Sequence, residues 1–330
     1  MKKLLVTYSL LILSATLMKA QDPQFTQFYA NPLYLNPAFA GTSIQRRVVV
    51  ASRVQWVSIP GAFQTYSASY DQYFPLIKSG FGLDVYYDRA GSGGLSTTSA
   101  KMMYAYELKL KRNLYIRPAA EIGYFQRGID LNRLTFGDQL NTGNPISSIP
   151  IDQQRKQFFD IGAGVLLYSP SYWAGMSFAH INQPDQSLLN DKSPLPMQFS
   201  LHGGYKFKLQ NRKALNRDNI LIAVHYKAQN KFDQLDLGAY YEHNAFTVGV
   251  WYRGLPIVYS ETTGIGRDAV ALLFGYDING VKIGYSYDIT ISQLGLNTGG
   301  SHEITIVYEW ANRNNKRHSR KRRVIPCAKF

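Results

Sequence analysis

The residue types that most often carry catalysis or bind metals and phosphates are present in this sequence, but they form no recognised motif. The six histidines are scattered, and none belongs to an H-E-x-x-H pair that would bind zinc from one helix face. There is neither a G-x-S-x-G turn nor a P-loop, and the glycine-rich stretch 91–94 precedes no helical pattern. We therefore predict that the protein is not an enzyme and holds no cofactor or metal. The alternative is a lipase that assembles serine and histidine from different strands.

Most of the net charge of +14 comes from the two ends of the chain. Residues 1–20 carry three lysines and residues 312–330 carry eight Lys or Arg, in both cases without an acidic residue, which leaves +3 for residues 21–311. A nucleic-acid-binding domain would gather its basic residues on one face of the fold, so we predict no nucleic-acid partner. The 45% hydrophobic and 14% aromatic content excludes a disordered chain.

Residues 1–20 have the pattern of a secretory signal peptide. Two lysines follow Met1, residues 4–18 are largely apolar, and Ala20 is a small residue before the predicted mature start at Gln21. The apolar run is shorter than the roughly 20 residues of a spanning helix, which disfavours the alternative of an uncleaved anchor.

Almost every segment after residue 45 alternates apolar and polar residues, which is the period of a β-strand. Ile304 and Ile306, for example, alternate with Glu303 and Thr305. The sequence predicts an all-β fold of about 14 strands, because a bilayer-spanning strand needs about 9–11 residues. We place them at 45–57, 62–73, 79–89, 96–108, 113–125, 158–168, 171–180, 197–209, 219–229, 235–243, 246–254, 268–277, 280–289 and 301–311.

The predicted connections differ in length between the two ends of the strands. Turns such as 75–78 and 109–112 are short, whereas alternate connections such as 126–157, 181–196 and 255–267 are long. Short periplasmic turns and long extracellular loops are typical of a transmembrane antiparallel β-barrel. We therefore predict an outer-membrane barrel over residues 45–311, in contact with lipid and with both termini on the periplasmic side.

Two groups of side chains fit such a barrel. Aromatic residues near strand ends are expected to form girdles at the membrane interfaces: Trp56, Tyr70, Tyr73, Tyr86, Tyr87, Tyr104, Tyr124, Tyr168, Tyr172, Trp173, Tyr252 and Trp310. Carboxylates on the polar strand faces are expected to line a polar lumen: Asp84, Asp88, Glu107, Glu121, Asp160, Asp236 and Glu242.

Residues 21–44, between the signal peptide and the barrel, are not strand-like. Three prolines interrupt any ladder, and two Asn-Pro pairs mark turns. The segment is too apolar to remain in water, so we expect it to dock inside the lumen near the periplasmic mouth or on a partner. It is either a luminal plug or a packing segment that only closes the barrel. Its candidate partner-binding residues are Asp22, Pro23, Phe25, Phe28, Asn31, Pro32, Asn36 and Pro37.

Residues 312–330 form a basic tail on the predicted periplasmic side. Self-repulsion should keep it extended, and it would attract an acidic periplasmic protein or anionic lipid headgroups. The lone cysteine in this tail excludes an internal disulfide framework, and it is either a reactive thiol or an unpaired apolar residue. The candidate partner-binding residues are Arg317, Arg320, Lys321, Arg322, Arg323, Ile325, Pro326, Cys327 and Phe330.

The first mature residues, Q-D-P-Q-F-T-Q-F-Y-A-N-P-L-Y-L-N-P-A-F-A-G-T, closely resemble the N-terminal signature of the PorP/SprF family of type IX secretion system membrane proteins of Bacteroidetes. Residues 266–277, 282–290 and 300–304 agree with late-strand motifs of that family. Residues 325–330 resemble its usual ending, with Ala328 in place of a proline. The resemblance therefore spans the mature chain.

This resemblance implies an outer-membrane barrel that supports export or surface anchoring of a secreted surface protein and, in some members, gliding motility. The implied partners are periplasmic components of the secretion ring and motor and a large secreted surface protein. The strand pattern alone is also compatible with a passive diffusion porin, which is the alternative function.

Overall fold

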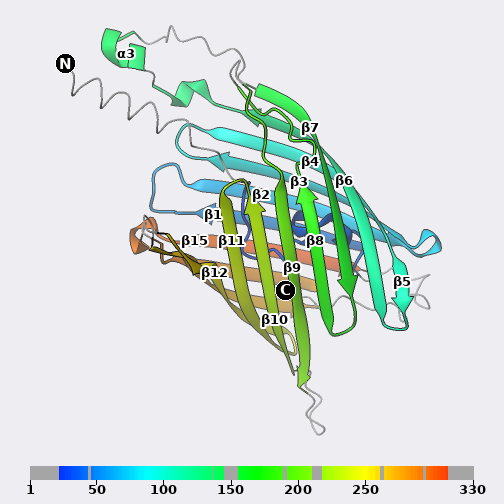
Figure 1. Ribbon diagram of the computed structural model, residues 1–330. Coiled ribbons are helices and arrows are strands. Elements are labelled where there is room, and N and C mark those ends of the chain that lie inside the picture. The colour runs from blue at the N-terminus through cyan, green and yellow to red at the C-terminus, as the bar shows by residue number, and fades with distance from the viewer. Residues whose placement is uncertain are drawn as a thin grey trace.

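The computed structural model describes residues 22–43, 46–135, 137–144, 155–188, 192–209, 218–260, 264–292 and 295–310, which form a closed antiparallel β-barrel (Figure 1). The wall closes because β1 (Arg46–Gln55) pairs with β15 (Ser301–Trp310) and β4 (Leu95–Tyr106) pairs with β6 (Leu114–Gly128). The sheet contains 15 strands, but β5 (Leu108–Lys111) is only a four-residue extension beside β6, so 14 strands make the wall.

The remaining elements follow in chain order. The other wall strands are β2 (Phe63–Phe74), β3 (Ser79–Ala90), β7 (Arg155–Tyr168), β8 (Tyr172–Ala179), β9 (Gln198–Leu209), β10 (Asp218–Gln229), β11 (Phe232–His243), β12 (Phe246–Ser260), β13 (Gly264–Ile278) and β14 (Val281–Thr290). The short helices are α2 (Pro32–Leu35), η1 (Pro37–Phe39), η2 (Pro75–Ile77), η3 (Leu131–Arg133), α3 (Gly137–Thr142) and η4 (Leu296–Thr298). Within the described ranges, no helix is long and apolar enough to cross a membrane.

The period-two pattern places polar side chains inside the barrel and apolar ones outside. On β15, Ile304 and Ile306 are 51% and 44% exposed, whereas Glu303 and Thr305 are 1% and 0% exposed. This arrangement is the reverse of a soluble sandwich, whose apolar faces point inward, and it is the pattern of a barrel with a lipid-facing exterior. The predicted fold class is therefore confirmed.

The two ends of the barrel differ as predicted. One end, called the short-turn end, carries connections such as 169–171, 244–245 and 279–280. The opposite, long-loop end carries 129–154, 180–197 and 291–300. β1 begins and β15 ends at the short-turn end.

Two predicted connections are wrong in detail. The predicted turn 109–112 is mostly strand, because β4 ends at Tyr106 and β5 covers Leu108–Lys111. Glu107 separates the two: its N–H donates to the Lys78 carbonyl and its carboxylate accepts from Arg117. The strand then resumes as β5. The predicted long loop 255–267 is instead the upper part of the β12–β13 hairpin. Register shifts at Arg253/Gly254 and between Leu255 and Tyr259 interrupt the alternation that predicted the shorter strands.

Four of the twelve predicted girdle aromatics point inward instead. Tyr73, Tyr86, Tyr168 and Trp173 are at most 9% exposed. All four side chains point into the lumen, where Tyr86 and Trp173 contact Tyr34 and Tyr29 of the N-terminal segment. Aromatic residues at the alternate strand positions face outward. Tyr87, for example, is 41% exposed.

Candidate functional site

The lumen holds residues 22–43, here called the plug, which appear dark blue within the barrel in Figure 1. The plug joins β1 at the short-turn end. Its other tip, Asp22, bonds His180 directly after β8 and Gln229 at the end of β10, both at the long-loop end. The plug therefore runs the length of the lumen and is not confined to the short-turn mouth.

The plug is buried almost completely. Of residues 22–43, all but Asp22, Pro23, Gln24 and Tyr34 are buried. Phe28 lies against the rings of His225 and Trp251, with centroids 4.7 and 4.9 Å apart. Enclosure of these apolar rings explains why the segment does not remain a free tail.

The Asn-Pro pairs shape the plug as expected from proline chemistry. Pro32 and Pro37 occupy the first position of α2 and η1, where the missing N–H costs no hydrogen bond. Asn36 caps η1 by accepting from the Ala38 N–H at 2.8 Å, and its amide donates to the Met176 carbonyl at 3.0 Å. Asn36 therefore ends α2 with its backbone N–H, which bonds the Pro32 carbonyl, and its side chain begins η1 and attaches the plug to β8.

Two wall glycines leave room for the plug backbone. A Cβ at Gly80 would overlap the Ala40 carbonyl, and a Cβ at Gly164 would overlap the Asn36 amide. Both positions face the lumen, so the wall and the plug approach more closely there than any other residue type allows.

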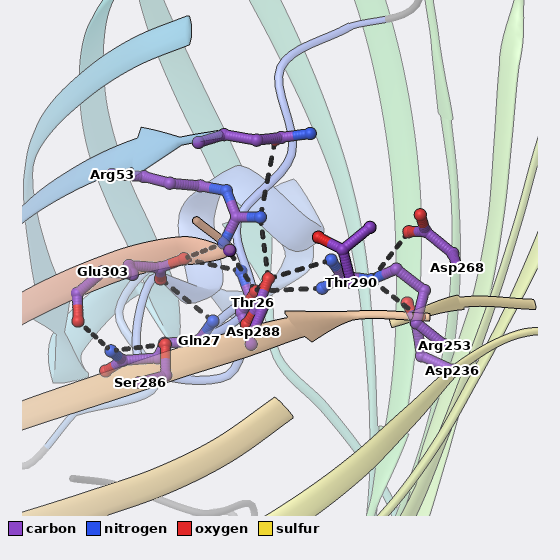
Figure 2. A network of polar contacts seen from close by, with 12 residues as sticks. Thr26, Gln27, Arg53, Asp236, Arg253, Asp268, Ser286, Asp288, Thr290 and Glu303 are labelled. Carbon is purple, nitrogen blue, oxygen red and sulfur yellow. Dashed lines mark hydrogen bonds and ion pairs between the residues drawn. The ribbon is translucent and has the colours of Figure 1, made fainter. Parts of the chain in front are cut away.

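A buried ionic network centres on Thr26 of the plug (Figure 2). Arg53 of β1 and Arg253 of β12 donate to the Thr26 hydroxyl oxygen at 2.6 and 2.9 Å. The hydroxyl in turn donates to Asp288 of β14 at 2.7 Å. Asp288 also pairs with both guanidinium groups, at 2.8 and 3.1 Å. The single hydroxyl thus uses its proton and both lone pairs to join three wall strands.

Glu303 of β15 binds the plug main chain. Its two carboxylate oxygens accept the N–H groups of Thr26 and Gln27 at 2.7 and 2.9 Å. The Gln27 side chain donates to the Glu303 carbonyl and to the Ser286 hydroxyl at 3.0 and 3.2 Å. The plug forms no β-strand, so these bonds supply its main-chain N–H groups with the acceptors that a β-ladder would otherwise provide.

Arginine and aspartate hold the plug at the short-turn end. Arg117 donates to the carbonyls of Ala38 and Ala40 and pairs with Glu107 at 2.8 Å. Asp71 accepts from the Gly41 N–H at 2.7 Å and from Arg47 at 2.7 Å. The last turn of the plug is therefore bound by side chains from β1, β2 and β6.

His180 holds the plug tip at the long-loop end. Its imidazole lies 2.9 Å from Asp22 and 3.0 Å from Asp160. Burial disfavours the charged imidazole, but the Asp22 carboxylate beside it outweighs this and raises the pKa of His180 to about 9. Burial likewise opposes the Asp22 charge, and the neighbouring His180 nevertheless lowers the pKa of Asp22.

Sequence reasoning missed a Ser–His–Asp chain inside the wall. The Ser200 hydroxyl lies 3.0 Å from Nε2 of His225, whose Nδ1 lies 3.2 Å from Asp236. This order is that of a nucleophile, base and acid. However, Ser200 is only 5% exposed, Phe28 covers the His225 ring, and Asp236 is also paired with Arg253. We assign these residues to packing between wall and plug.

The structure brings together one of the two predicted groups of site residues. All eight candidates of the N-terminal segment lie in the plug, and Asn31 donates to Ser67 of β2 at 3.0 Å. The predicted lumen carboxylates Asp84, Glu121, Asp160 and Asp236 are buried, as expected for inward positions. The tail candidates, from Arg317 to Phe330, lie outside the described residues.

These features define a transmembrane β-barrel of the outer-membrane type whose lumen contains its own N-terminal segment. The profile of the family described as "Type IX secretion system membrane protein PorP/SprF" matches residues 17–308. The chain belongs to this family, and its place is the outer membrane.

Other comparisons add only distant likenesses. Among solved structures, the chain is similar to the monoaromatic hydrocarbon channel CymD (TM-score 0.47, 13% identity, covering 86% of this chain and 93% of that one). It is also similar to the toluene transporter TodX of P. putida (TM-score 0.45, 11% identity, covering 84% of this chain and 93% of that one). A third similar structure is the Acinetobacter baumannii outer membrane protein Omp33 (TM-score 0.43, 9% identity, covering 82% of this chain and 100% of that one). No curated protein matches the sequence.

Replacing Thr26 by valine should weaken the attachment of the plug. The substitution keeps the shape but leaves two buried guanidinium donors and one carboxylate without their shared partner, which costs about 1–3 kcal/mol. The measurement is urea unfolding of the purified barrel in lipid vesicles. Tryptophan fluorescence reports on the plug, because Trp173 and Trp251 contact Tyr29 and Phe28.

Two variants control this experiment. Thr26→Ser keeps the hydroxyl and should unfold nearly as the natural protein does. Thr305→Val removes another buried hydroxyl, which has no hydrogen-bond partner among the described residues, and should not lower stability. If Thr305→Val destabilises as much as Thr26→Val, the network has no special role.

Replacing His180 by glutamine should destabilise the barrel in a pH-dependent way. Because the folded pKa of about 9 lies above the ordinary value of about 6.5, the charge stabilises fully below about pH 6.5 and its contribution is lost as the pH rises through about 9. The difference in unfolding midpoint between the natural protein and His180→Gln should therefore shrink over this range.

His243 provides the matched control, because its imidazole pairs with Asp218 at 2.7 Å but is 41% exposed. His243→Gln should change stability little, since exposed pairs contribute only about 0–1 kcal/mol. A His180→Gln difference that stays constant from pH 6 to pH 10 would contradict the assigned charge.

Proposed function

We propose that this protein is an outer-membrane component of the type IX secretion system that supports export or surface anchoring of a secreted surface protein. It acts through periplasmic contacts to the ring and motor of the secretion machinery, and it serves gliding motility where its host glides. Family membership supports the secretion system as its setting. The observation that carries the rest of the proposal is the plug, because a lumen occupied along its length fits a scaffold better than an open diffusion pore.

The orientation follows from loop length. In outer-membrane barrels the short turns face the periplasm and the long loops face outward. The β1 start and the β15 end then lie on the periplasmic side, as does the junction with the basic tail 312–330. The plug tip at Asp22 lies at the outer mouth. The proposal also takes residues 1–20 as a cleaved signal peptide, so that the mature chain begins one residue before this tip.

Deleting residues 22–40 should convert the barrel into a conducting pore. The full chain, reconstituted in planar bilayers, should pass little current, because the plug occupies the lumen. The deletion variant should pass a stable current. Leu76→Ala, at a fully exposed turn position, should behave as the natural protein does.

The same measurement tests the alternative function. A large steady conductance of the full chain would favour a passive diffusion porin. Unchanged conductance after the deletion would contradict the role of residues 22–40 as a barrier.

A chain that ends at Ala311 should still insert in the outer membrane but should no longer co-purify with periplasmic secretion components. The barrel strands remain intact, whereas the tail with its eight basic residues is lost. The measurement is mild-detergent isolation from the native outer membrane and identification of the associated proteins.

A second variant separates charge from the apolar ending. It replaces Arg320, Lys321, Arg322 and Arg323 by glutamine and keeps residues 324–330. Equal loss in both variants would assign the contact to the charges. If the truncated chain retains all its partners, the tail does not dock them.

A further inference from the structure

One side of the short-turn end extends beyond its neighbouring strand. β5 continues β4 along β6, because the pair of Leu108 and Ile116 follows the register of the β4–β6 ladder. On the other side of β4, β3 begins at Ser79, which pairs with Tyr106. The tip of the β5–β6 hairpin therefore projects past the end of β3 (Figure 1).

The outward face of this extension continues the lipid-facing side of the wall. Tyr104 and Tyr106 are exposed on the outer face of β4. Leu108 and Leu110 of β5 follow at alternate positions and are 43% and 54% exposed. The apolar column of the barrel exterior therefore runs from β4 onto β5.

The β2–β3 turn, residues 75–78, borders the same surface. The Lys78 carbonyl accepts the Glu107 N–H at 2.8 Å, and the Ile77 carbonyl accepts the Ser79 hydroxyl at 2.9 Å. The Ile77 side chain is exposed. Turn and hairpin together form one surface, here called the rim patch, which consists of Ile77, Lys78, Leu108, Lys109, Leu110, Lys111 and Arg112.

The rim patch carries four positive charges. All four basic side chains are exposed, and none forms an ion pair with a described residue: Lys78, Lys109, Lys111 and Arg112. The carboxylates of the adjacent strands are already engaged, because Glu107 pairs with Arg117 and Asp71 pairs with Arg47. The short turns 169–171, 244–245 and 279–280 contain no charged residue. Among these described turns, the positive charge is concentrated on the side of β2–β6.

A row of aromatic rings indicates the depth of the patch in the membrane. Phe74, Phe81 and Tyr104 lie side by side on the outer faces of β2, β3 and β4, with successive ring centroids 5.4 and 5.1 Å apart. Exposed aromatic residues near strand ends mark the boundary between hydrocarbon and headgroups in outer-membrane barrels. The rim patch lies at the end of the strands beside this row, so its charges reach the depth of the lipid phosphates.

The arrangement of the patch favours a lipid over an acidic protein as its occupant. Leu108 and Leu110 share the lipid-facing side of the wall, so acyl chains reach them without another partner. Lys109 and Lys111 alternate with these leucines and therefore face away from the hydrocarbon, and their apolar stems allow the ammonium groups to reach the headgroups. Arginine, as at position 112, binds phosphate through paired N–H groups.

We propose that the rim patch binds an anionic phospholipid, with Leu108 and Leu110 among its acyl chains and the four basic side chains around its phosphate. Basic residues close to an anionic membrane surface attract such lipids. The site rests on the proposed function only for its side of the membrane, since short turns that face the periplasm place the lipid in the periplasmic leaflet.

The test uses the full mature protein in a neutral detergent and native mass spectrometry, which counts bound lipids during a titration. The probes are dioleoyl phosphatidylglycerol and dioleoyl phosphatidylcholine, which differ only in the headgroup. The natural protein should bind its first phosphatidylglycerol about tenfold more tightly than phosphatidylcholine, because only the former carries a net charge. This preference should weaken as the ionic strength rises.

Two matched lysine variants locate the site. Lys109→Gln should weaken binding of phosphatidylglycerol about fivefold, which corresponds to about 1 kcal/mol for one basic residue, and should not change binding of phosphatidylcholine. Lys231→Gln removes another exposed lysine, at the tip of the β10–β11 hairpin and at the long-loop end. This control should bind both lipids as the natural protein does.

A combined variant measures the whole patch. Replacement of Lys78, Lys109, Lys111 and Arg112 by glutamine should abolish the preference for phosphatidylglycerol. The basic tail 312–330 is present in every variant, so a difference between variants belongs to the patch. Leu110→Ser should weaken binding of both lipids to a similar extent, since it removes apolar contact and no charge.

Equal binding of the two lipids by the natural protein would overturn the proposal. A preference that survives in the combined variant would assign the lipid to another surface, and equal losses in Lys109→Gln and Lys231→Gln would do the same. If both lipids bind alike and an acidic periplasmic protein co-purifies with the natural barrel but not with the combined variant, the patch binds that protein instead.

The lipid assay requires no secretion machinery, so its outcome is separate from that of the proposed function. A barrel that keeps its lipid preference but isolates without secretion components would refute the proposed function alone. A barrel that isolates with those components but binds the two lipids equally would refute the lipid site alone.

Discussion

The plug and the charged wall depend on each other for their hydrogen bonds. The plug has no β-ladder, so its main-chain groups are satisfied by wall side chains, notably Glu303 for the Thr26 and Gln27 N–H groups and Arg117 for the Ala38 and Ala40 carbonyls. In the other direction, the guanidinium groups of Arg53 and Arg253 share the Thr26 hydroxyl. A charge that stays buried but loses its partner costs several kcal/mol, so the plug and the wall stabilise each other as long as the plug occupies the lumen.

The fold was predictable because its main signal is local. Every wall strand carries its own period-two pattern, and a closed barrel is the only sheet that leaves no edge in lipid. The errors fall where a residue departs from that pattern for a tertiary reason. Glu107 pairs with Arg117 at the end of β4, and the short strand β5 follows where a turn was predicted at 109–112. The bulge after Arg253 hid the upper part of the β12–β13 hairpin.

The site was less predictable because it is built across the barrel. Composition and prolines identified residues 21–44 as a non-strand segment that must dock, but they could not give its path. The partners of Thr26 come from β1, β12 and β14, separated from it by 27, 227 and 262 residues. The inward aromatics such as Trp173 show the same limit, since a tyrosine or tryptophan near a strand end is compatible with either face until parity and register are known.

The two ends of the plug differ in how firmly they are enclosed. At the short-turn end, Arg117, Arg47 and Asp71 bind its last residues, and residues 39–43 are all buried. At the long-loop end, Asp22 and Gln24 border separate cavities, and Phe232 of β11 and Leu255 of β12 line the second one. The tip is held chiefly by His180 and Gln229. The wall therefore makes fewer hydrogen bonds to the plug at the long-loop end than at the short-turn end.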